Sequence, residues 1–178
     1  KRWGAIAVVA GVGVTYAGAP YIDVAVFYPT SYDVARVEVY YALPLQNFVP
    51  KDGFYNFNVG ARLTHANEGG IVAERLVHKM AAARAGQEAP TTIGQFTFEV
   101  SPGEYMLSLG AADANDPAKT PVIVTNPLTV SAPAAGVAIS AIELVSAAGP
   151  GDGDTGNEFF KNSYLVVPNP TKIVDDRD

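Results

Sequence analysis

The chain has 178 residues, which suits one domain with short extensions, and it carries a net charge of −6. This acidic balance, with 12 basic residues scattered along the chain, disfavours nucleic-acid binding, because phosphate binding requires clustered Lys and Arg. The absence of cysteine excludes disulfides, thiolate metal sites and a cysteine nucleophile.

The first twenty residues combine features of a signal peptide and of a membrane anchor. Lys1 and Arg2 precede an uncharged run from Trp3 to Ile22, which contains the A-x-A-like sequence Ala17-Gly18-Ala19. A run of ~20 apolar residues can also span a bilayer, although its glycines weaken a helix. Three interpretations stay open for residues 1–20: a cleaved signal, a retained anchor, or an extended apolar arm bound to a partner. All three place the domain outside the cytoplasm or at a membrane surface.

From Tyr21 onward, the side chains alternate with the period of two that is typical of β-strands. Residues 22–28 and 37–41 form the first two predicted strands. The clearest strand follows the turn signal Lys51-Asp52-Gly53. One face of this strand is apolar and consists of Tyr55, Phe57, Val59, Ala61 and Leu63. The other face is polar and includes Asn56, Asn58, Arg62 and Thr64, as in an antiparallel sheet with one hydrated face.

The sequence Asn67-Glu68-Gly69-Gly70 predicts a hairpin loop. The segment 71–85 after it is ambiguous, because its composition favours a helix whereas its position after a hairpin favours a strand. We predict a strand that extends at least to Lys79.

The second half of the chain contains further short strands. Phe96 and Phe98 lie in one predicted strand, and Tyr105 begins the next after the turn Ser101–Glu104. The remaining predicted strands cover residues 122–124, 128–130, 137–143 and 164–167. Asn126-Pro127 is expected to interrupt the first two of these, and a Gly- and Asp-rich loop at 149–158 precedes the last.

Roughly eight short strands separated by turns predict an all-β fold, an immunoglobulin-like antiparallel β-sandwich with an apolar N-terminal arm. The predicted arm covers residues 1–20, the sandwich covers 21–170, and a charged tail covers 171–178. Tyr105 follows a Pro-Gly turn, so its hydroxyl is expected to bond back to the backbone of that corner.

Three stretches carry a family resemblance: RVEVYYALP at Arg36–Pro44, SPGEY at Ser101–Tyr105, and the pair SAIEL and VVPNP, which end at Leu144 and Pro170. In order and spacing they resemble the β-sandwich region of GWxTD-domain proteins, a family of exported bacterial proteins. The Gly-Trp-x-Thr-Asp signature and the helical region that carries it are absent. The resemblance therefore implies the sandwich and no activity.

Candidate metal sites are weak. His65 and His78 lie on either side of the predicted hairpin and, with Glu74, could hold a metal, but they lack an HExxH or similar spacing. The loop from Asp152 to Glu158 and the group Asp113, Asn115 and Asp116 resemble parts of a calcium site without its full ligand set. We interpret the histidines as ordinary surface or half-buried residues and the acidic segments as loops.

A catalytic site is not expected either. No G-x-S-x-G motif occurs, and Gly11-Val12-Gly13 lacks the third glycine and the acidic residue of a dinucleotide site. We therefore predict a non-enzymatic protein with no catalytic, cofactor-binding or metal-binding residues.

Aromatic side chains are the best interaction signal, because tyrosine and tryptophan favour interfaces and membrane boundaries. The candidate interaction residues are Trp3, Tyr16, Tyr21, Phe27, Tyr28, Phe159 and Phe160. Ordinary core packing is the alternative for Phe27, Tyr28, Phe159 and Phe160.

Charged residues make up only 17% of the chain, so much of its surface is expected to be neutral or covered. Together with the apolar arm, this predicts a structural subunit on the periplasmic face of a bacterial membrane, where it braces a larger protein complex. Bacteria with the resembling family include phototrophs, so a photosynthetic reaction centre with its antenna rings is one candidate complex. The alternative is an envelope module that binds glycans or peptides.

Overall fold

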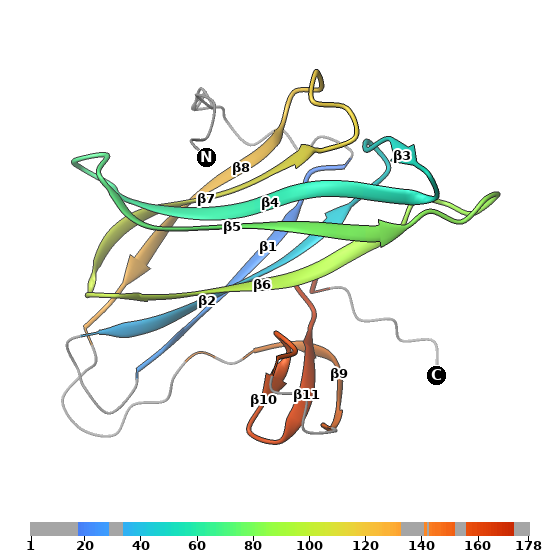
Figure 1. Cartoon of the computed structure of the whole chain (residues 1–178). Coiled ribbons are helices and arrows are strands. Elements are labelled where there is room, and N and C mark those ends of the chain that lie inside the picture. Colours follow the sequence, from blue (N-terminus) through green and yellow to red (C-terminus); the bar gives the residue numbers. More distant parts are fainter. Residues whose placement is uncertain (1–17, 29–33, 133–140, 142, 152–155, 173–178) are drawn as a thin grey trace.

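The computed structural model describes residues 18–28, 34–132, 141, 143–151 and 156–172 (Figure 1). The strands are β1 (Tyr21–Phe27), β2 (Ala35–Pro44), β3 (Pro50–Lys51), β4 (Phe54–His65), β5 (Ile71–Ala82), β6 (Thr91–Val100), β7 (Gly103–Asp113), β8 (Val122–Val130), β9 (Val145–Pro150), β10 (Phe160–Lys161) and β11 (Tyr164–Pro168). These ranges contain strands and turns and no helix, which confirms the all-β prediction. A helix long and apolar enough to cross a bilayer is accordingly not found within them.

The strands form three antiparallel sheets. The first sheet has the order β1-β2-β6. The second sheet has the order β3-β4-β7-β8, and β5 pairs with β4. These two sheets pack face to face as a β-sandwich, and the C-terminal sheet, with the order β10-β11-β9, lies beside the first sheet (Figure 1).

The core lies between the first and second sheets. Every second residue of β4 points into it, and the five apolar residues that the alternation assigns to one face are all buried. From β2, Val37, Val39, Tyr41 and Leu43 point into the same layer. Buried aliphatic and aromatic side chains of β6 and β7 complete it, so the period of two in the sequence translates directly into a shared apolar layer.

The ambiguous segment after the hairpin is a strand, as predicted. His65 donates its backbone N–H to the carbonyl of Gly70 (2.9 Å), and Gly69 adopts a φ of +66° that glycine accommodates without strain. The strand β5 then pairs with β4 from Phe54 to Thr64, with one register shift beside Leu63. Pairing with an existing strand therefore decides the conformation of a sequence whose composition favours a helix.

Two predictions about the later strands are wrong. Asn126-Pro127 does not interrupt a strand: β8 is continuous from Val122 to Val130, with Pro127 opposite Met106. A proline is tolerated there because β8 lies at the edge of its sheet, where alternate residues direct their N–H groups away from the neighbouring strand. The predicted loop at 149–158 begins too early, because β9 continues to Pro150.

The predicted strand at 137–143 falls mostly outside the described residues. Ala141 and Glu143, which are described, do not lie in a strand. Ala141 instead donates its backbone N–H to the carbonyl of Val26 in β1 (3.2 Å).

The tyrosine corner predicted at Tyr105 is confirmed. Its hydroxyl donates to the backbone carbonyl of Ser101 at 2.7 Å, and burial raises its pKa. Tyr41 provides a contrast, because its buried hydroxyl has no hydrogen-bond partner among the described residues. This hydroxyl lies over Gly94, where a Cβ atom would come within 2.2 Å of it.

We predict that the Tyr→Phe substitutions at positions 105 and 41 affect the free energy of unfolding differently. Tyr105→Phe should lower the free energy of unfolding by about 0.5–1.5 kcal/mol, because it removes a made hydrogen bond. Tyr41→Phe should leave it unchanged or raise it, because it removes a buried hydroxyl that has no protein partner. Urea titration of both variants measures the difference, and a larger loss for Tyr41→Phe would contradict the hydrogen-bond assignment.

Candidate functional site

The predicted aromatic residues that the structure describes do not gather on one surface. Trp3 and Tyr16 lie outside the described residues. Tyr21, at the start of β1, is 48% exposed. Phe27 and Tyr28 are half-buried, and the hydroxyl of Tyr28 donates to the backbone carbonyl of Ser131. Of the described candidates, only Tyr21 therefore presents a large exposed ring.

Phe160 begins β10 of the small C-terminal sheet, and Phe159 lies in the turn before it and accepts the backbone N–H of Val166 (2.8 Å). Both are half-buried, and Phe160 pairs with Leu165 in the β10–β11 hairpin. The ring of Phe160 fills the space beside Gly151, where a Cβ atom would come within 2.3 Å of it. These contacts fit the core-packing alternative better than an exposed aromatic pair.

His65 ends β4 and His78 lies in β5, and the two histidines are far apart. His65 stacks on the ring of Tyr105 with a centroid distance of 5.5 Å, whereas His78 lies opposite Asn58 and contacts its side-chain oxygen (3.2 Å). Seven residues of a strand separate these positions, a distance of roughly 24 Å. No group of three potential metal ligands occurs within the described ranges. The hypothesis of a metal site with both histidines is therefore wrong.

The group at Asp113 has a structural role. The buried carboxylate of Asp113 accepts backbone N–H groups from Val49 (2.7 Å), Asn115 (2.9 Å) and Asp116 (3.2 Å). The side-chain amide of Asn115 donates to the carbonyls of Val49 (2.8 Å) and Phe54 (3.0 Å). These bonds join two loops at one end of the sandwich. The acidic loop at 152–155 lies outside the described residues.

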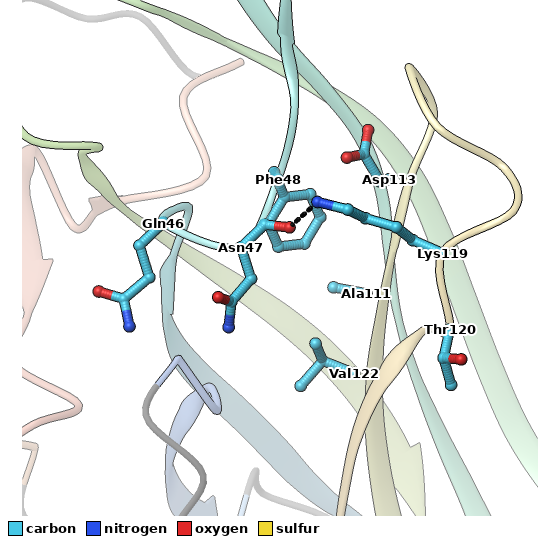
Figure 2. Close-up of a pocket in the computed structure, with 8 residues that line it drawn as sticks. All are labelled: Gln46, Asn47, Phe48, Ala111, Asp113, Lys119, Thr120 and Val122. Atoms are coloured by element: carbon cyan, nitrogen blue, oxygen red, sulfur yellow. Dashed lines mark hydrogen bonds between the residues drawn. The ribbon is translucent and has the colours of Figure 1, made fainter.

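A pocket of about 390 Å³ lies beside these loops (Figure 2). Its walls combine polar side chains with the apolar groups of Phe48, Ala111 and Val122. The Lys119 ammonium donates to the backbone carbonyl of Asn47 (2.7 Å), as Figure 2 shows, and the Asp113 carboxylate is bound to the backbone. The charged groups of the pocket are thus occupied by protein contacts, which leaves them little capacity to fix a ligand.

The strongest electrostatic feature is a cluster between the first sheet and the C-terminal sheet, which we call the Lys161 cluster: Glu38, Tyr40, Glu143 and Lys161. The Lys161 ammonium contacts Glu38 (2.6 Å), Glu143 (2.8 Å) and the hydroxyl of Tyr40 (3.0 Å). Tyr40 also donates to Glu38 (2.6 Å), and the exposed guanidinium of Arg36 reaches the second oxygen of Glu38 (2.9 Å). Two carboxylates are therefore balanced by two basic groups.

The alternation of β2 produces this cluster. Glu38 and Tyr40 alternate with the inward-facing Val37, Val39 and Tyr41 and point away from the core. The C-terminal sheet covers them, and only 5% of the Glu38 side chain is exposed. Burial alone would raise the pKa of Glu38, but the hydrogen bonds and positive charges of Lys161, Tyr40 and Arg36 hold it below its usual value. Burial and the neighbouring Glu38 raise the pKa of Tyr40.

The Lys161 cluster is the centre of an ionic interface. Lys79 of β5 pairs with Glu158 (2.5 Å), and Lys172 pairs with Asp23 of β1 (2.9 Å). No residue from 143 onward belongs to the described core of the sandwich. Ion pairs therefore join this part of the chain to β1, β2 and β5, and we interpret the Lys161 cluster as structural rather than catalytic.

The strongest candidate for an interaction surface is β5, which the aromatic signal does not identify. Ile71, Leu76 and Met80 are 59%, 50% and 61% exposed on the outer face of the second sheet, and Val72 and Val77 are also exposed. We call these five residues the β5 apolar surface. The sequence indicates this exposure in one way. The apolar residues of β5 occupy both faces of the strand, so packing one face on the core cannot bury them all.

No protein-family model matches the chain, and no curated protein matches it. A functional proposal therefore rests on the geometry of the chain itself.

Removal of the Lys161 ammonium should release the C-terminal sheet without unfolding the sandwich. In Lys161→Met, we expect amide exchange in β9 and β11 to accelerate by roughly 10- to 100-fold, equivalent to a charged hydrogen bond of about 1.5–3 kcal/mol. Exchange in β4 and β7 should not change. Lys51→Met, at an exposed lysine, is the control, and equal acceleration in both variants would contradict the assignment.

The low pKa of Glu38 predicts an acid-labile contribution to stability. Because the unfolded chain binds this proton more readily, the contribution is complete above the unfolded value of 4.5 and is lost as the pH falls through the lower folded value. Wild type should therefore be more stable than Glu38→Gln at about pH 7, and the difference should shrink towards about pH 3. Urea midpoints across this range provide the measurement, and a constant difference would rule out this role for Glu38.

Proposed function

We propose that the chain is a non-enzymatic structural subunit that braces a larger membrane protein complex from the periplasmic side. The observation that carries the proposal is the β5 apolar surface, five large aliphatic side chains exposed on one twelve-residue strand. Single exposed apolar residues are ordinary, whereas several large ones on one strand, with Ile71, Leu76 and Met80 on its outer face, favour a contact with another molecule. The low fraction of charged residues is consistent with a chain that is partly covered by neighbours.

The ionisable side chains support a non-enzymatic role. The carboxylates of Glu38 and Asp113 are engaged in contacts that hold the fold, and His65 and His78 lie far apart. Catalysis requires a nucleophile, an acid or a base that can reach a substrate. The described contacts of these groups instead join strands, loops and sheets.

The geometry favours a protein partner over a glycan. Glycan binding uses exposed aromatic platforms, and the described exposed rings of Tyr21, Phe54 and Tyr164 lie on three different strands. The exposed aliphatic side chains, in contrast, share β5. A photosynthetic reaction centre with its antenna stays the candidate complex, on the family resemblance alone.

The proposal predicts that charges on β5 release the chain from its complex. We expect wild type, extracted from native membranes in mild detergent, to migrate with a large complex. The double variant Leu76→Lys/Met80→Lys should migrate alone at its own mass of 18.7 kDa, because each lysine would have to be desolvated at the contact. Both positions are exposed, so the variant should remain folded.

The matched control is Leu144→Lys/Val145→Lys, which alters two comparably exposed apolar residues at the start of β9. This variant should still migrate with the complex. Wild type that migrates alone, or a β5 variant that stays in the complex, would contradict the proposal.

A further inference from the structure

The backbone edge of β5 has no partner strand in the described part of the chain. β5 pairs with β4 alone, and the far side of β4 is occupied by β7 and the short β3. β6 follows β5 through a corner but forms no ladder with it. In a strand, alternate residues direct their N–H and C=O groups to opposite sides. Half of the twelve-residue strand therefore directs its backbone groups away from the sheet, which makes it a template for another strand.

The opposite edge of the same sheet is protected. β8 carries Pro127, which has no N–H, and its exposed residues Asn126 and Thr129 are polar. Prolines and polar side chains are the usual means by which proteins block strand addition. β5 contains no proline, and the pairing of Lys79 with Glu158 partly neutralises one of its charges. Of the two edges of the second sheet, β5 is the one open to a further strand.

The charges along β5 indicate the chemistry of that strand. Between positions 71 and 84 the chain has three basic residues, Arg75, Lys79 and Arg84, and one acidic residue, Glu74, which pairs with Arg62 (3.3 Å). Arg75 is exposed and donates to the backbone carbonyl of Glu74 (3.1 Å). Glu74 and Lys79 are paired with Arg62 and Glu158, so the exposed guanidinium of Arg75 is the charge of β5 without an ion pair among the described residues, and it favours an acidic partner.

The register of β5 with β4 places Leu76 and Met80 on one face of the strand and Arg75 on the other. Leu76 and Met80 lie opposite Gly60 and Asn56, on the outer face. Arg75 lies opposite Ala61, which is buried, and therefore belongs to the face directed towards the core side. A strand laid beside β5 would meet the side chains of Leu76 and Met80 on one face, and the guanidinium of Arg75 beside Val77 on the other.

We propose that β5 accepts an extended segment of a partner protein as an additional strand, with aliphatic side chains towards Leu76 and Met80 and acidic side chains towards Arg75. This inference rests on the proposed function, since it specifies how the β5 apolar surface binds its partner. Main-chain hydrogen bonds supply affinity in such strand addition, and the alternate side chains supply specificity. A second copy of β5 is a poorer occupant, because two strands that each carry the unpaired charge of Arg75 would then meet.

The test uses the full chain and three synthetic peptides of about ten residues, a usual strand length. The first alternates Val and Glu, the second alternates Val and Lys, and the third is the Val–Glu peptide with a central proline. Affinity is measured by fluorescence anisotropy at low salt, and hydrogen exchange locates the contact. We expect the Val–Glu peptide to slow exchange in β5 and not in β8, and to bind at least about tenfold more tightly than the other two.

A charge reversal tests the proposed face. Arg75→Glu, at an exposed side chain, should invert the preference, so that the Val–Lys peptide binds more tightly than the Val–Glu peptide. Thr129→Glu on β8 is the control and should leave the preference unchanged. A purely structural role for Arg75 would not produce the inversion.

Three results would overturn the inference: no slowing of exchange in β5 with any peptide, equal binding of the acidic and basic peptides, or a dimer of the chain with β5 protected. If these occur while Leu76→Lys/Met80→Lys still releases the chain from its complex, strand addition is wrong and the proposed function stands. If that double variant also stays in the complex, both are wrong.

Discussion

The apolar layer between the first and second sheets determines where the other features of the chain lie. β2 and β4 both direct alternate residues into this layer, and the buried side chains of Tyr41, Leu43, Phe57 and Leu63 occupy it from the two sides. Because each strand contributes only every second residue, β2 necessarily turns Glu38 and Tyr40 to its opposite face. The same alternation in β5 leaves Leu76 and Met80 on the outer face, where no part of the described chain buries them.

The C-terminal sheet and β5 illustrate two ways to attach a neighbour to a sandwich. Polar and charged contacts centred on Lys161 hold the C-terminal sheet, and such contacts depend on pH and on ionic strength. β5 offers exposed aliphatic side chains and an open backbone edge, and contacts of this kind depend on shape and on the burial of apolar area. The contacts of Lys161 are made within the chain. On our proposal, the contacts of β5 are made by a partner protein.

The residue pattern within a segment was sufficient to predict the strands and turns whose conformation does not depend on their position in a sheet. The strict alternation from Tyr55 to Leu63 predicts both the strand and its buried face, and the Pro-Gly turn predicts the hydrogen bond of Tyr105. Position in the sheet explains the failures. Pro127 was expected to interrupt a strand, but β8 lies at an edge where it is tolerated. The exposure of Leu76 has the same origin, because whether a strand is central or at an edge depends on long-range pairing that residues 71–82 do not encode by themselves.

Site-specific photo-crosslinking in native membranes tests the central claim most directly. A photoreactive residue at Met80 on β5 is compared with one at Thr129 on β8, since both are exposed and they occupy opposite edges of one sheet. Our account predicts that Met80 crosslinks in high yield to one protein subunit, through an extended segment of that subunit, and that Thr129 does not. Equal yields at the two positions, or crosslinks at Thr129 alone, would contradict β5 as the docking edge.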